Sequence, residues 1–122
     1  AFVEAERYNG PSIIIAYSHC IAQGIDMTKG SKEQKKAIDA GYWTLMRFNP
    51  DLINEGKSPL VIDSKEPGGD LADFMAGENR FRITKKANAE KYDQLVDLAK
   101  EKLARRNKVM RMMSTNLVDS EK

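Results

Sequence analysis

The stretch Tyr8-Asn9-Gly10-Pro11-Ser12-Ile13-Ile14-Ile15-Ala16-Tyr17 decides the fold class of this 122-residue chain. Its first half predicts the end of a helix over residues 1–8, because Asn-Gly suits a left-handed helix C-cap and proline cannot continue a helix. Its second half is a short, β-branched, continuously apolar run, the pattern of a strand buried on both faces of a parallel sheet. Helix, short turn and buried strand together indicate the last step of an α/β domain.

The sheet that this strand needs has no other member in the chain. A strand must pair its backbone groups with neighbours, and no second segment has the same apolar character as residues 12–17. The first residues, Ala1 to Arg7, contain neither an initiator Met nor the basic and apolar regions of a signal peptide. We therefore expect an α/β fragment, cut inside a helix, whose remaining sheet belongs to a larger protein.

Composition excludes several classes of protein. The 20 Lys and Arg residues nearly balance the 18 Asp and Glu residues, so the net charge of +2 indicates neither a nucleic-acid nor a membrane partner. The longest apolar run, residues 13–17, is far shorter than the roughly 20 residues that cross a bilayer. One cysteine cannot form an intrachain disulfide, which favours a reducing compartment such as the cytoplasm.

The remainder of the sequence predicts a mainly helical segment over residues 31–122. Residues 18–30 are typical of a loop, and Ser31 with Gln34 matches the capping box that starts a helix. An apolar stripe then predicts a helix over residues 32–48. Further elements are expected as a strand over 59–63, a short helix over 70–76 and a long amphipathic helix over 88–110, with fraying from Met112 onward.

Cys20 is the first candidate for chemistry because it directly follows the predicted strand. Ligands of α/β folds usually bind at the carboxyl ends of strands, and a thiolate is a strong ligand for iron or zinc. Such sites normally need four ligands, whereas this chain has one cysteine and one histidine. On residue chemistry alone, an inert thiol is the commoner meaning and a ligand or nucleophile the rarer one.

Other candidate motifs favour structural roles. A catalytic pair of His19 and Cys20 is disfavoured, because adjacent side chains seldom point at each other and no third residue orients the imidazole. Lys29-Gly30-Ser31 lacks the spacing of a phosphate-binding loop. The acidic residues of the middle segment have no paired spacing, so turn and cap roles are expected for Asp63, Glu66 and Asp70. We assign no catalytic residue.

The run of residues 8–25 resembles a segment near the C-terminus of the pyruvate:ferredoxin (flavodoxin) oxidoreductases. Other motifs resemble the same family in the same order: Glu33-Gln34-Lys35-Lys36-Ala37, Ala40-Gly41-Tyr42-Trp43, Arg47-Phe48-Asn49-Pro50, Asp63-Ser64-Lys65-Glu66-Pro67 and Gly77-Glu78-Asn79-Arg80-Phe81. The final helix is similar only in character. Gln23 departs from the His associated with its place, and His19 stands where Pro is also common.

The resemblance implies an oxidoreductase that decarboxylates pyruvate oxidatively with coenzyme A, yielding acetyl-CoA and CO2. It implies thiamine diphosphate with Mg2+, and electron transport through [4Fe-4S] clusters to ferredoxin or flavodoxin. In this family the cysteine at the position of Cys20 is the remote fourth ligand of the cluster nearest the thiamine. The other three cysteines lie far upstream, so the expected metal and cofactor-binding residue of this chain is Cys20 alone.

The resemblance also implies where the chain sits in its parent enzyme. Residues 1–30 would end the doubly wound thiamine diphosphate-binding α/β domain and carry the cluster-ligand loop. Residues 31–122 would form a mainly helical C-terminal extension able to embrace the second subunit of a homodimer. Partners would be the remainder of the parent polypeptide, that second subunit and the electron acceptor, in the cytoplasm or an anaerobic organelle. The isolated chain is expected to be inactive, without cofactor, and to hold Cys20 as a free thiol.

Two alternatives remain at this point. The chain could be a small stand-alone helical interaction module with an incidental cysteine, or a natural separate subunit. A stand-alone module should cover residues 12–17 within one compact monomer. An enzyme fragment should leave them without partners.

Overall fold

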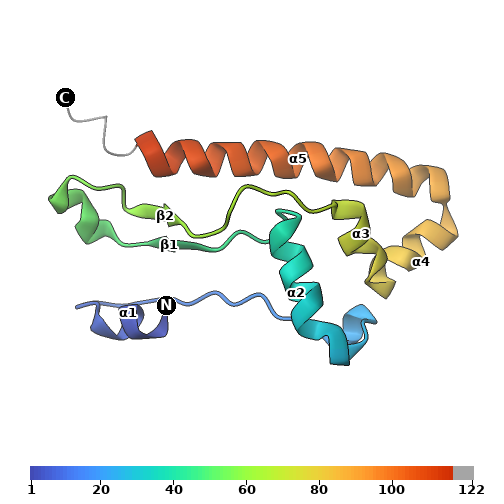
Figure 1. Ribbon diagram of the computed structural model, residues 1–122, viewed down its shortest axis with the longest axis horizontal. Helices are drawn as coiled ribbons and strands as arrows, with labels where there is room; N and C mark the ends of the chain where they lie inside the picture. Colours follow the sequence, from blue (N-terminus) through green and yellow to red (C-terminus); the bar gives the residue numbers. More distant parts are fainter. Residues whose placement is uncertain (117–122) are drawn as a thin grey trace.

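The computed structural model describes residues 1–116. This part contains a two-stranded sheet, five helices and three short 3-10 segments. In chain order, the elements are α1 Phe2–Arg7, η1 Ile21–Gln23, η2 Met27–Lys29, α2 Gly30–Asp39, β1 Met46–Phe48, η3 Pro50–Glu55, β2 Leu60–Ile62, α3 Leu71–Ala76, α4 Asn79–Ala87 and α5 Ala89–Asn116. Helix α5 runs along one side of the molecule, with the β1–β2 ribbon beside its C-terminal half and α3 and α4 near its start (Figure 1).

The hydrophobic core lies where α2, α3 and α5 meet. Phe74 of α3 is its centre, with 1% of its surface exposed, and its ring lies 4.9 Å from that of Tyr42. The other buried members of this core are Ala37, Ala40, Leu71, Met75, Tyr92 and Val96. The predicted short helix and the predicted long helix therefore supply most of the core, as their apolar spacing indicates.

Helix α2 is shorter than predicted and has a different start. The sequence predicts a helix over 32–48 capped by Ser31, whereas α2 begins at Gly30 without a side-chain cap and ends at Asp39. Gly41 adopts a left-handed backbone with φ of 70° and terminates the helix. From α5, Arg106 Nη2 donates hydrogen bonds to the carbonyls of Gly41 (2.7 Å) and Tyr42 (2.9 Å). This distant partner stabilises a turn that helical periodicity does not reveal.

The last three residues of the predicted helix, 46–48, form the first strand of an antiparallel ribbon. Arg47 of β1 stands opposite Val61 of β2, and β2 lies within the strand predicted over residues 59–63. Between the two strands, the Asn49 side chain accepts a hydrogen bond from the backbone of Asp51 and starts η3. The prediction of β2 is confirmed, whereas that of helix through residue 48 is wrong.

Residues 12–17 form no strand, which corrects the prediction of a buried one. Every residue from 11 to 16 is exposed, with Ile13 at 87% and Ile15 at 77% of their surfaces. Within the described part of the chain, no backbone group of residues 12–16 has a hydrogen-bond partner. The segment crosses from α1 toward α2 apart from the β1–β2 ribbon (Figure 1). Within residues 1–116, neither β1 nor β2 pairs with this segment.

The C-terminal half follows the prediction closely, with one added helix. Asp70 caps α3 through a 2.9 Å hydrogen bond from the backbone N–H of Ala72, and α5 starts one residue after its predicted start. Helix α4 was not predicted. Helix α5 continues to Asn116, so the prediction of fraying is wrong for residues 112–116. The rest of that prediction lies outside the described residues. None of the described helices could span a bilayer.

Candidate functional site around Cys20

Cys20 lies at the start of η1 with its side chain exposed and its thiol free. Its backbone is extended, with φ of −142° and ψ of 143°. The sulfur accepts a hydrogen bond from the backbone N–H of Ala22 at 3.4 Å. The residue therefore caps a turn with its sulfur while the thiol stays open to an incoming group.

These features fit one ligand of a metal cluster but not a complete site. Backbone N–H donors to sulfur are among the contacts that tune the reduction potential of iron–sulfur clusters. Among residues 1–116, no group of three or more His, Cys, Asp or Glu side chains could hold a metal ion. Since Cys20 is the only cysteine of the sequence, a four-cysteine site would need three ligands from another part of a larger protein.

The His19 side chain does not form a catalytic pair with Cys20 in this structure. Its half-buried imidazole packs over Gly30, where any added Cβ would collide with the ring. Its Nδ1 atom is buried without a hydrogen-bond partner in the described structure, and no contact joins the imidazole to the thiol. The geometry agrees with the sequence argument against a Cys–His pair.

Tyr17 attaches the chain before Cys20 to the helical part. Its ring stacks on Trp43 with centroids 5.3 Å apart and meets the edge of Tyr42 at 6.1 Å. Its backbone carbonyl accepts a hydrogen bond of 3.3 Å from Nε2 of Gln34. The sequence assigned Gln34 to a capping box, and its side chain instead reaches back across 17 residues.

A charged residue of α4 also contacts Tyr17. Nη2 of Arg80 donates to the Tyr17 hydroxyl at 3.4 Å, while Nε of Arg80 pairs with the carboxylate of Glu78. Burial raises the pKa of Tyr17, and the nearby charge of Glu78 raises it further. Sequence reasoning missed these three residues, and the only available signal was their place in motifs that resemble a known family.

The chain after Cys20 is fixed as well. Gly24 takes a left-handed backbone, with φ of 68°, close against the side chain of Asn79, and Ile25 is buried. The hydroxyl and backbone of Thr28 both hydrogen-bond the carboxylate of Asp26, and these bonds lower the pKa of Asp26. The loop that carries Cys20 is therefore attached on both sides.

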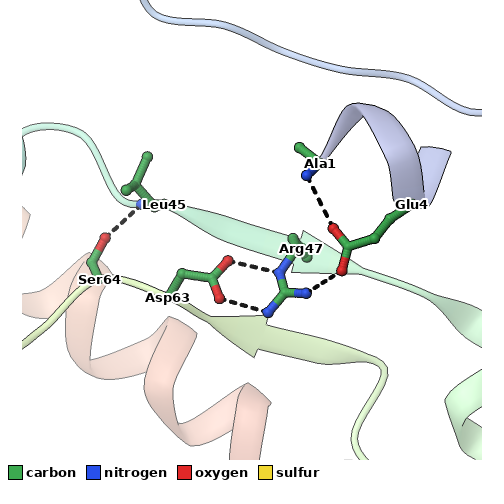
Figure 2. A network of polar contacts seen from close by, with 6 residues as sticks. All are labelled: Ala1, Glu4, Leu45, Arg47, Asp63 and Ser64. Atoms are coloured by element: carbon green, nitrogen blue, oxygen red, sulfur yellow. Dashed lines mark hydrogen bonds and ion pairs between the residues drawn. The ribbon is translucent and has the colours of Figure 1, made fainter.

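A separate polar network surrounds Arg47 (Figure 2). Its guanidinium donates two hydrogen bonds, of 2.9 and 2.7 Å, to the carboxylate of Asp63 and one of 2.5 Å to Glu4 of α1. The hydrogen bonds from Arg47 lower the pKa of Asp63. All three side chains are substantially exposed, and the network connects α1 with the ribbon.

The remaining predicted acidic residues also have structural roles. Glu66 pairs with Nε of Arg111 at 2.8 Å, and Asp70 caps α3. The prediction of turn and cap roles is confirmed for Asp70, while Asp63 and Glu66 form ion pairs.

Comparison with known proteins adds named relatives. No family model matches the chain. A pyruvate:ferredoxin oxidoreductase of Moorella thermoacetica is 52% identical over 78% of this chain and 8% of that protein. A pyruvate-flavodoxin oxidoreductase of Rhodospirillum rubrum is 45% identical over 93% of the chain and 10% of that protein. The mitochondrial pyruvate dehydrogenase [NADP(+)] of Euglena gracilis is 42% identical over 93% of the chain and 6% of that protein. The chain thus spans a tenth or less of the length of these relatives.

Proposed function

Because the chain is homologous to one segment of the pyruvate:ferredoxin and pyruvate-flavodoxin oxidoreductases, we propose that it works as part of an enzyme that oxidises pyruvate. The family resemblance predicted from the sequence is confirmed by identities of 45–52% over 78–93% of the chain. The proposed reaction consumes pyruvate and coenzyme A, releases acetyl-CoA and CO2, and delivers electrons to ferredoxin or flavodoxin.

Within that enzyme, the proposed role of this chain is to supply Cys20 as one ligand of a [4Fe-4S] cluster. The cluster would contribute one-electron transfer, and thiamine diphosphate with Mg2+, held elsewhere, would contribute the carbanion chemistry. The residues of this chain bind and orient: Cys20 offers its thiolate, and the N–H of Ala22 donates to the sulfur. No residue of the chain is assigned to the thiamine, the magnesium or the substrate.

The observation that carries the proposal is that Cys20 has an exposed free thiol and follows a solvent-exposed apolar segment. Residues 11–16 are exposed and apolar at four positions, Ile13, Ile14, Ile15 and Ala16. An unpaired apolar segment of this kind is a ready partner for a sheet edge. A larger protein could supply both the strands that would pair with this segment and the three further cysteines of a cluster. One explanation then covers the unpaired segment and the single cysteine.

The alternative of a stand-alone interaction module has less support. It predicts that residues 12–17 are covered within one compact monomer, and residues 11–16 are exposed instead. The assignment of residues 1–30 to the thiamine-binding domain and of residues 31–122 to a C-terminal extension toward a second subunit remains part of the proposal. So does a cytoplasmic or anaerobic-organelle location.

The decisive experiment compares the parent enzyme with its Cys20→Ser variant, both purified without oxygen. We expect Cys20→Ser to lower the iron content by up to one cluster, to change the cluster signals in electron paramagnetic resonance, and to reduce pyruvate-dependent reduction of ferredoxin. Ser18→Ala is the matched control, because it removes a neighbouring exposed side-chain donor and leaves the thiol in place. Unchanged iron and spectra in Cys20→Ser would refute the ligand role.

The isolated chain provides a second test. One cysteine should not hold a four-iron cluster, so reconstitution with iron and sulfide should leave Cys20 fully reactive toward a thiol reagent. A stoichiometric four-iron cluster on the isolated chain would contradict the proposal.

A further inference from the structure

The Glu78–Arg80 pair lies next to the residue that attaches the Cys20 loop. Only 2% of the Glu78 side chain is exposed, against 35% for Arg80. A buried carboxylate is costly unless it is paired and hydrogen-bonded, so Glu78 requires the guanidinium of Arg80. A second nitrogen of that guanidinium, Nη2, reaches the Tyr17 hydroxyl.

The guanidinium has little freedom to move. Its carbon atom lies 4.6 Å from the centre of the Phe81 ring, and Phe81 in turn packs edge-on against Phe74 in the core. The planar fork of arginine, with Nε on Glu78, therefore fixes the direction of its other donors. Arg80 presents one of those donors to Tyr17 from the core side.

Tyr17 is the first residue attached to the helical part after the exposed segment. Residues 11–16 are all exposed, whereas Tyr17 is half-buried against Trp43 and Tyr42. From there the exposure alternates: Tyr17 and His19 are half-buried, and Ser18 and Cys20 are exposed. Such alternation is expected of extended chain, where successive side chains point to opposite sides. A shift of Tyr17 would therefore also shift the thiol three residues later.

We propose that Arg80, held by the buried Glu78, is a positioning residue for the Cys20 thiol and acts through the Tyr17 hydroxyl. This inference rests on the proposed function for its meaning, because a cluster ligand has to arrive at one defined place. Its physical content is independent of any cluster: α4, more than 50 residues away in sequence, sets the mobility and direction of Cys20.

The test uses the 122-residue chain with a nitroxide spin label on Cys20, its only cysteine. Tyr17→Phe removes the hydroxyl and keeps the ring, and Arg80→Ala removes the donor. We expect the mobile fraction of the label signal to rise roughly twofold in either variant, the change in population that losing a hydrogen bond at the weak end of the usual range produces, since this bond is 3.4 Å long. Arg80→Lys keeps the positive charge for Glu78 but has a single donor nitrogen in place of the guanidinium fork, so it should restore only part of the order.

Arg105→Ala is the matched control, because Arg105 is an exposed arginine of α5. Its label signal should equal that of the unsubstituted chain. If Arg80→Ala unfolds the chain, as circular dichroism would reveal, Tyr17→Phe decides alone. A folded Tyr17→Phe variant with an unchanged label signal overturns the inference. The ligand role is tested separately by iron content in Cys20→Ser, so failure of one proposal is distinguishable from failure of the other.

Discussion

At the scale of single residues, Gly41 shows how backbone and packing can exclude a side chain together. Its φ of 70° is strained for any residue with a Cβ, and an added Cβ would lie 2.7 Å from Nδ2 of Asn107 and 2.8 Å from Cγ of Pro67. We predict that Gly41→Ala lowers the free energy of unfolding by about 2–4 kcal/mol, from backbone strain plus collision. Denaturant titration followed by circular dichroism measures this change.

Gly56 supplies the control for that prediction. Its φ of 66° is nearly the same, but no atom lies within 4 Å of an added Cβ. Gly56→Ala should therefore cost only the backbone strain, about 1–2 kcal/mol. Equal losses in the two variants would show that Asn107 and Pro67 do not confine position 41.

Cys20 illustrates what single residues reveal without their surroundings. Residue chemistry alone does not decide whether Cys20 is an inert thiol or a metal ligand, because the sequence contains no second cysteine. The structure adds an exposed thiol with one backbone donor, which agrees with a ligand role but supplies no second ligand in the described part. We propose that Arg80 directs its side chain through Tyr17, and no local sequence pattern predicts the Arg80–Tyr17 hydrogen bond.

At the scale of elements, the segment 12–16 is the clearest case of a missing partner. Its amides have no hydrogen-bond acceptors in the described structure, so we predict that they exchange with solvent deuterium at nearly the rate of an unfolded chain. Amides in the middle of α5 should exchange far more slowly. Mass spectrometry of the isolated chain after pulse labelling measures both.

The same segment should be protected in the parent enzyme. If a sheet of that enzyme pairs with residues 12–16, their exchange should slow by orders of magnitude relative to the isolated chain. Fast exchange in both settings would argue against a strand at this place.

Asp70 caps α3, a helix whose position the sequence predicts correctly. The Asp70 carboxylate accepts the backbone N–H of Ala72 at 2.9 Å, and α3 carries three buried core residues. We predict that Asp70→Ala lowers the free energy of unfolding by about 1 kcal/mol, the usual cost of losing an N-cap. Thermal unfolding provides the measurement. Asp93→Ala, on the exposed face of α5, should change it little, and equal effects would exclude a capping role.

At the scale of the whole molecule, the Arg47 network links α1 to the β1–β2 ribbon. The hydrogen bonds from Arg47 hold the pKa of Asp63 below its ordinary value of 3.8. A carboxylate with a lowered folded-state pKa contributes stability above its unfolded pKa and loses that stability as the pH falls through the folded value. The chain should therefore lose stability on acidification below about pH 4.

The variant Arg47→Gln isolates this contribution. Urea titrations at about pH 5 and about pH 3 should give a smaller loss of stability in the variant than in the unsubstituted chain, because its Asp63 has no cation to lose. Added salt should also weaken the effect, since the pair is exposed. Identical pH dependence in both chains would place the acid sensitivity elsewhere.

Local signals in the sequence predict α3, β2 and the start of α5, because apolar periodicity and an Asp cap depend on neighbouring residues alone. It also predicted that residues 12–17 would lack a sheet. The end of α2 and the strand at residues 46–48 depend instead on tertiary contacts, because Arg106 on α5 holds the Gly41 turn across 65 residues. The setting of Cys20 was decided in the same way. Contacts between distant residues carry no periodic signal, and they outweighed local helical preference at these places.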